Sequence, residues 1–248
     1  MNIPYVIIKD IRVDNLSKDD ILAKLPLVIK QRKQLHIITL NSLMFYETQR
    51  KKELKDLINS AEIVTPDGAG ILWAARVLGY KLKERVTGYE LFLRFLNWAN
   101  DNKSSVFLLG ARQKVLDKVV FLITRSYKNI RIAGKHHGYF DKKRENEIVE
   151  AIRKVRPDFL FVGMGFPQQE IFIYNFREEI NVPIMIGIGG SFDVFAGRKP
   201  RCPKWIGNIG LEWLFRVFTD IKYLPRIFKL PLFVIEILWY RLFKAKVV

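Results

Sequence analysis

Short apolar runs alternate along this chain with longer segments whose apolar residues recur at helical spacing. The short runs are rich in β-branched or aromatic residues and mostly end at Gly, Asn or Pro, as buried strands do. They lie at residues 35–40, 61–65, 105–110, 130–134, 158–165 and 182–190. The helical spacing occurs within residues 17–33, 42–60, 111–127 and 143–156. Because the predicted strands are apolar almost throughout, we expect an α/β fold with a mainly parallel sheet and helices on both faces.

The composition changes in the last part of the chain. From Arg198 onward, eleven Lys or Arg residues stand against three acidic residues, with ten aromatic residues among them. This pattern predicts basic amphipathic helices, interrupted at Pro225 and Pro231, that bind an anionic interface. The most apolar stretch, residues 230–240, is too short to span a membrane. The predicted organisation is one domain at residues 1–195 and a helical appendage at residues 196–248.

The net charge of the chain indicates which classes of partner it binds, and its cysteine content indicates its cellular compartment. The 248 residues carry a formal net charge of +17, which predicts a nucleic acid, an anionic membrane surface or a phosphorylated substrate as partner. Cys202 is the single cysteine, so no internal disulfide can form, which favours a reducing compartment. The N-terminal segment lacks the basic and apolar regions of a signal peptide. We therefore expect a cytoplasmic protein.

The predicted strands end in loops of small and polar residues that lead into predicted helices. In open α/β sheets, ligands bind outside these ends, where N–H groups at helix starts attract anions. The loops lie at residues 39–42, 65–70, 109–112, 163–170 and 187–193. Each of their glycines, taken singly, is more typical of a turn or of close packing. As a set, Gly110, Gly163, Gly165 and Gly189 predict a nucleotide site.

These loops do not contain the common nucleotide-binding signatures. Two have G-x-G without a third glycine at the dinucleotide spacing, and no G-x-x-x-x-G-K-[ST] loop occurs. This weighs against a nucleotide-dependent oxidoreductase. The three histidines show no metal-ligand spacing, so we expect neither a metal nor a cofactor. If a diphosphate leaves during a reaction at this site, its charge then has to be met by helix starts and by Arg or Lys.

Asp67 follows a predicted strand in the segment TPDGAG. One interpretation makes it the N-cap of the next helix. The other makes it a general base toward a hydroxyl, with Gly68 and Gly70 opening space beside the carboxylate. Arg85 likewise fits either an ordinary surface arginine before a helix or a partner of a diphosphate.

The sequence resembles the WecG/TagA/CpsF family of bacterial glycosyltransferases, in order and over nearly its whole length. The motifs are TLNSLMF, TPDGAGILWAARVLG, ERVTGYELF, FLLGA, HHGYF, PDFLFVGMGFPQQE, GIGGSFDVFAGRKPRCPKW and GLEWLFRVFTD. The resemblance implies a Rossmann-like domain that transfers a sugar from a UDP donor to a sugar on undecaprenyl diphosphate. The TagA branch implies N-acetylmannosamine moved with inversion onto lipid-linked GlcNAc, as in wall teichoic acid linkage units. UDP-N-acetylmannosaminuronic acid and UDP-glucose remain alternative donors.

The resemblance also assigns roles to residues that bind the acceptor and carry the reaction. The family's catalytic aspartate matches Asp67, which implies proton removal from the acceptor hydroxyl. Its active-site Thr and Asn match Thr39 and Asn41, which would orient the acceptor or the carboxylate. Its ERVTG arginine matches Arg85, which would meet the departing diphosphate.

Further positions match the family's donor site. Gln169 is implied to hold the donor sugar or phosphate. Tyr139 and Asp193 are implied to contact uridine, by stacking and by hydrogen bonding. Arg216 and Arg226 of the appendage would fold over the pocket as a lid and meet phosphate charge. The appendage thereby gains two roles, anchor and lid, at the inner face of the plasma membrane.

Basic charge with aromatic residues also suits a protein that binds single-stranded nucleic acid. Against this alternative, the charge concentrates beside long apolar runs, and no RNP, KH or helix-turn-helix signature is visible. We therefore expect a membrane surface and no nucleic acid as partner. The sequence leaves the oligomeric state open, with a homo-oligomer as one option.

Overall fold

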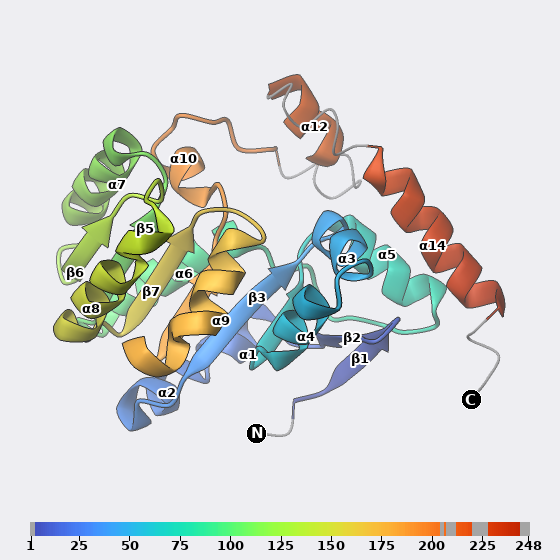
Figure 1. The fold of residues 1–248 in the computed structure, drawn as a ribbon, viewed down its shortest axis with the longest axis horizontal. Helices are drawn as coiled ribbons and strands as arrows, with labels where there is room; N and C mark the ends of the chain where they lie inside the picture. Colours follow the sequence, from blue (N-terminus) through green and yellow to red (C-terminus); the bar gives the residue numbers. More distant parts are fainter. Residues whose placement is uncertain (1–2, 204–205, 207–211, 220–227, 244–248) are drawn as a thin grey trace. The chain divides into compact units, whose positions relative to one another are not determined.

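The computed structural model describes residues 3–203, 206, 212–219 and 228–243 (Figure 1). The chain divides into two compact units, each built from several segments. The first unit comprises Met1–Ser17, Thr39–Thr87 and Pro200–Val248, and the second comprises Lys18–Ile38 and Gly88–Lys199. The expected boundary after residue 195 stays a prediction.

A six-stranded sheet has the order β4-β3-β8-β7-β5-β6. The strands are β3 (Leu35–Leu40), β4 (Ile63–Pro66), β5 (Ser105–Gly110), β6 (Arg131–His136), β7 (Phe159–Gly163) and β8 (Ile184–Gly187). The pairs β3–β8, β8–β7, β7–β5 and β5–β6 are all parallel. Each strand overlaps a predicted apolar run, and β3 and β5 have the predicted bounds, so the expected mainly parallel sheet is confirmed.

Helices cover both faces of the sheet in the second unit. Helices α8 (Glu145–Val155) and α9 (Gln168–Ile180) form one core with alternate residues of β5, β7 and β8. On the other face, α6 (Gly88–Asp101) places the ring of Phe92 5.0 Å from Phe161, and α10 (Ser191–Phe195) adds Phe192. Helix α7 (Gln113–Ser126) and the short η1 (Lys142–Arg144) also belong to this unit. The predicted α/β layering is therefore confirmed.

Two predicted helices are each split in two. The first splits into α1 (Lys18–Leu22) and α2 (Leu25–Gln31), with Pro26 in the first turn of α2. A proline has no N–H and its ring clashes with the carbonyl four residues earlier, so one helix cannot continue through it. The second splits into α3 (Ser42–Thr48) and α4 (Lys52–Ser60).

The first unit begins with an antiparallel hairpin that the sequence pattern did not predict. Strands β1 (Tyr5–Ile8) and β2 (Ile11–Asp14) are joined by Lys9 and Asp10, whose φ angles are 45° and 69°. Such turns usually carry Asn-Gly or Asp-Gly, so Lys-Asp gave no signal. Buried Asp14 ties the hairpin to β4, because its carboxylate accepts the N–H of Val64 at 2.7 Å.

The C-terminal helix α14 (Lys229–Phe243) packs on α3 and on α5 (Ala69–Val77) within the same unit (Figure 1). Phe233 is buried, with its ring 5.5 Å from that of Phe45 and edge-on to it. The carboxylate of Glu236 pairs with Lys9 and with Arg50. These two ion pairs thus add to the apolar contact between Phe233 and Phe45.

The expected interruption of the appendage at Pro231 is wrong, because helix α14 continues through this residue. It lies in the first turn of α14, where the N–H that proline lacks has no partner within the helix. Pro225 lies outside the described residues. The other described helix of the appendage is α12 (Glu212–Thr219). No described helix is long and apolar enough to cross a membrane.

Candidate active site

Three hydrogen bonds bring the strand ends of the first unit together. The backbone N–H of Asp67 donates to the carbonyl of Leu40 at 2.8 Å, which joins the ends of β4 and β3. The N–H of Val86 donates to the carbonyl of Pro66 at 2.9 Å, and the Thr65 hydroxyl donates to the carbonyl of Val86 at 3.4 Å. The segment before α6 is thereby fixed against the end of β4.

This arrangement gathers the four predicted catalytic residues. Thr39 and Asn41 flank the residue that Asp67 contacts, and Arg85 precedes the residue that is fixed to Pro66. Thr39 is buried, while Asn41, Asp67 and Arg85 are partly exposed. Residues far apart in the sequence therefore meet at one end of two strands, where open α/β sheets bind ligands.

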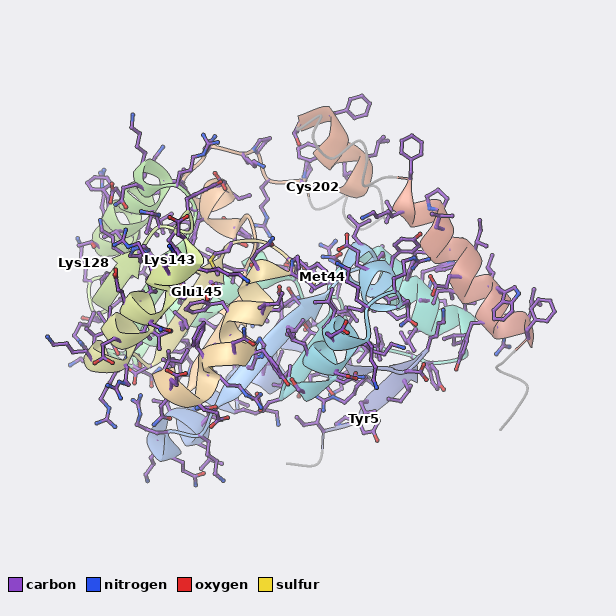
Figure 2. The ribbon with its side chains drawn as sticks, in the orientation of Figure 1. Tyr5, Met44, Lys128, Lys143, Glu145 and Cys202 are labelled. Carbon is purple, nitrogen blue, oxygen red and sulfur yellow. The ribbon has the colours of Figure 1, made fainter. Side chains whose placement is uncertain are left out.

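Asn41 has a structural role that the sequence analysis missed. Its Oδ1 accepts the backbone N–H groups of Leu43 at 3.0 Å and of Met44 at 3.1 Å, which makes it the N-cap of α3. Met44 lies in the first turn of this helix (Figure 2). Because the cap uses the amide oxygen, Nδ2 is the group of this side chain that can donate to a ligand.

The interpretation of Asp67 as a helix N-cap is wrong. The N-cap of α5 is Gly68, and it makes no side-chain capping bond. The expectation that Gly70 opens space beside the carboxylate is also wrong, because a Cβ there would lie 2.0 Å from Oγ of Ser42. A Cβ on Gly68 would meet nothing within 4 Å, so open space remains on that side.

We expect Gly68→Ala to destabilise the protein by about 1–3 kcal/mol, because φ of +99° and ψ of 159° form a conformation adopted almost only by glycine. Gly190→Ala is the matched control: Gly190 is also a helix N-cap next to open space, but its φ is −80°. Urea unfolding of both variants measures the difference. Equal stability of the two variants would contradict the conformational explanation.

In the second unit, Gln169 joins the loops that follow β7 and β8. Its buried side chain accepts the backbone N–H of Gly165 at 3.1 Å and of Gly189 at 2.9 Å, both at Oε1. Its Nε2 donates to Glu170 at 2.7 Å. The sequence suggested only a ligand contact for Gln169, but the structure engages both ends of its amide within the protein.

The four predicted glycines fall into two pairs. A Cβ on Gly110 would lie 2.4 Å from the carbonyl oxygen of Gly163, and a Cβ on Gly163 would lie 2.6 Å from the ring of Phe192. These two have the packing role that is typical of a single glycine. Gly165 and Gly189 have φ of +84° and +52° and nothing within 4 Å of a Cβ. Open space for a ligand is therefore found at the second pair.

Tyr139 and Asp193 lie on other elements of the second unit. Tyr139 follows β6 and is 68% exposed, and the guanidinium of Arg112 is 6.0 Å from its ring centroid. The N–H of Gly138 donates to the carbonyl of Ala111 at 2.9 Å, which fixes this loop to the end of β5. Asp193 lies in α10, and its carboxylate faces Arg198 at 3.4 Å.

The predicted lid lies mostly outside the described part of the chain. The backbone of Arg216 belongs to α12, but its side chain and all of Arg226 lie outside the described residues. The described residues contain no group of three or more His, Cys, Asp or Glu side chains that could hold a metal ion.

Burial raises the pKa of Glu170 from 4.5 to about 7, because its charged form loses hydration, although the bond from Gln169 opposes the shift. Between these two values the unfolded chain ionises while the folded protein keeps the proton, so stability falls as the pH rises. We expect Glu170→Gln to remove this loss, which is on the order of 3 kcal/mol for such a shift.

Urea unfolding at pH 5 and at pH 8 measures this effect as the difference between the variant and the wild type. Contributions from Asp14, whose pKa burial also raises, and from His36, whose pKa burial lowers to about 3, cancel in that difference. A difference that stays constant between the two pH values would show that Glu170 does not titrate as described.

Comparisons with known proteins agree with the family suggested by the motifs. The model of the glycosyl transferase WecG/TagA/CpsF family matches residues 6–247. A Bacillus subtilis (strain 168) protein named N-acetylglucosaminyldiphosphoundecaprenol N-acetyl-beta-D-mannosaminyltransferase is 33% identical over 96% of this chain and 89% of its own length. A Staphylococcus aureus (strain NCTC 8325) protein of the same name is 37% identical over 86% of this chain and 81% of its own. The chain therefore belongs to the WecG/TagA/CpsF family of glycosyltransferases.

Proposed function

We propose that this enzyme transfers N-acetylmannosamine from UDP-N-acetylmannosamine to GlcNAc carried on undecaprenyl diphosphate, with inversion at the anomeric carbon. The observation that carries the proposal is the meeting of Thr39, Asn41, Asp67 and Arg85 at the ends of β3 and β4. The names of the relatives give the acceptor and the transferred sugar, and the resemblance to the family implies UDP as the carrier of that sugar. The product is a disaccharide of the kind used in wall teichoic acid linkage units.

In the proposed mechanism, Asp67 accepts the proton of the acceptor hydroxyl while the oxygen attacks the anomeric carbon. The new glycosidic bond forms as the bond between that carbon and the β-phosphate oxygen breaks, and UDP leaves with the bonding electrons. Arg85 stabilises the negative charge that develops on the diphosphate. Thr39 and Nδ2 of Asn41 orient the acceptor or the carboxylate.

We place the donor at the loops of the second unit. The open space beside Gly165 and Gly189 gives the diphosphate access to the backbone. The exposed ring of Tyr139 can stack on uracil, and the carboxylate of Asp193 can accept a ribose hydroxyl. Gln169 serves this site by holding the loops.

A donor panel tests the proposed donor. UDP-N-acetylmannosamine, UDP-N-acetylmannosaminuronic acid and UDP-glucose are each supplied with a short-chain GlcNAc-diphospho-lipid, and acceptor-dependent UDP release is measured. We expect the first donor to give the highest kcat/KM. A higher value for either of the other two would contradict the assigned donor, but it would still support a glycosyltransferase.

Helix α14 offers a surface for the membrane that carries the acceptor. Phe233 and Ile237 on its inner face are buried within the first unit, to which the helix belongs. The opposite face is also apolar, with large exposed side chains three or four residues apart. They are Leu232, Ile235, Trp239 and Leu242, with Phe228 just before the helix. A helix that is apolar on two faces has a second apolar surface to bury, and we propose that the inner leaflet covers it.

A chelator is expected to leave turnover unchanged. In the proposed mechanism Arg85 meets the charge that develops on the diphosphate, so no step requires a divalent cation. Initial rates with and without excess EDTA measure this. Loss of activity that added Mg²⁺ or Mn²⁺ restores would overturn the metal-free mechanism.

A further inference from the structure

Glu170 is a carboxyl group buried in the first turn of α9, and only 1% of the residue is exposed. Its Oε1 accepts Nε2 of Gln169 at 2.7 Å. Its Oε2 is buried and has no hydrogen-bond partner among the described residues. A buried carboxyl group with one unpartnered oxygen costs stability, so this position needs an explanation other than packing.

The neighbouring amide provides that explanation. Two backbone N–H groups, from Gly165 and Gly189, point at one end of the Gln169 amide and require an oxygen there. Rotation of the amide by 180° would place its NH₂ group against those two donors. In the rotated amide the oxygen would also face the oxygen of Glu170. The acceptor on Glu170 therefore fixes which way the amide points.

The end of β8 is shaped around this pair. A Cβ on Gly187, the last residue of the strand, would lie 2.4 Å from Nε2 of Gln169 and 2.8 Å from Oε1 of Glu170. The two side chains thus occupy the space that any larger residue would take. The pair connects helix α9, the end of β8 and both glycine loops.

We propose that Glu170 is a positioning residue for donor binding, which orients the Gln169 amide so that the loops at Gly165 and Gly189 keep their shape. The role in donor binding rests on the proposed function, in which these loops receive the diphosphate. A proton on Oε2 leaves Oε1 able to accept, so the neutral acid performs this role and Glu170→Gln reproduces it. Glu170→Met has similar length and replaces the oxygen acceptor by a thioether sulfur, which accepts only weakly.

The test compares Glu170→Met, Glu170→Gln and a control, Ile173→Ala, which removes buried apolar atoms from the same helix. Backbone hydrogen exchange at Gly165 and Gly189 reports on the loops, UDP titration calorimetry on the site, and thermal unfolding on stability. For Glu170→Met we expect about tenfold faster exchange at both glycines and about tenfold weaker UDP binding, the size of one lost hydrogen bond. Glu170→Gln should stay within about threefold of the wild type.

Ile173→Ala should lower the melting temperature without changing UDP affinity. Wild-type exchange and affinity in Glu170→Met, or equal loss of affinity in Ile173→Ala, would overturn the proposal. Unprotected amides at Gly165 and Gly189 in the wild type would overturn it without any variant. If the wild type does not bind UDP, the proposed donor site fails, while the exchange rates still decide whether Glu170 orients the loops.

Discussion

Asp67→Asn is expected to lower kcat by about a hundred- to ten-thousand-fold, the usual contribution of a general base. The amide keeps the size of the side chain but cannot accept the proton of the acceptor hydroxyl. UDP affinity should be unchanged, because the variant alters neither Arg85 nor the loops of the second unit. Single-turnover rates and titration calorimetry measure the two quantities.

Asp56→Asn is the matched control, since Asp56 is an exposed aspartate on α4 of the same unit. It should turn over at the wild-type rate. Near-normal turnover by Asp67→Asn would show that this carboxylate is not the base. A parallel loss of UDP affinity and turnover would instead indicate that the variant disturbs the fold.

The second large effect is expected at the outward face of α14. Replacing Ile235 and Trp239 together by Ser should weaken binding to anionic vesicles at least tenfold, because each large apolar side chain contributes about 1.5–3 kcal/mol when buried. Salt should weaken the remaining binding, since it screens the attraction of basic residues to the surface. Vesicle co-sedimentation at two salt concentrations measures both parts.

The matched control is Phe121→Ser, which removes an exposed aromatic residue from α7 of the second unit. Vesicle binding by this control should not change. Unaltered vesicle binding by the α14 variant would contradict the proposal that this face of α14 binds the membrane. A shift with single-stranded oligonucleotide but none with vesicles would favour the nucleic-acid alternative. Truncation before Arg198 is a less specific test, because it also removes the packing of Phe233 on Phe45.

The predicted lid can be tested separately with a water-soluble acceptor. If Arg216 and Arg226 only belong to an anchor, their replacement by Ala leaves turnover of such an acceptor unchanged. If they reach the diphosphate, turnover is slow even without a membrane. We expect slow turnover from at least one of the two variants.

Most of the sheet could be predicted from the sequence because β3, β4, β5, β7 and β8 are buried along their whole length and therefore read as continuous apolar runs, whereas the edge strand β6 is only partly buried. The hairpin could not be predicted, since Lys9 and Asp10 form its turn with positive φ angles that are uncommon for these residue types. Pro26 gave a visible signal for the split between α1 and α2 that helical spacing alone obscured. Local composition thus predicts elements better than it predicts where they end.

The candidate site divides in a similar way. The motifs pointed to Asp67, but only the structure shows that Gly68, and not Asp67, caps α5. The glycines could be listed from the sequence, yet their sorting into packed and open pairs depends on side chains from distant segments. Glu170 gave no signal, because Gln-Glu at a helix start is ordinarily exposed, and its burial follows from the packing of α9 against β8.

The mass of the lipid product is the most direct measurement of the proposed reaction. The wild-type protein is incubated with UDP-N-acetylmannosamine and a short-chain GlcNAc-diphospho-lipid, and the lipid is analysed by mass spectrometry. We expect the lipid to gain one N-acetylhexosamine residue while an equal amount of UDP is released, and Asp67→Asn to form almost none of this product. UDP release with the lipid mass unchanged would contradict transfer to this acceptor.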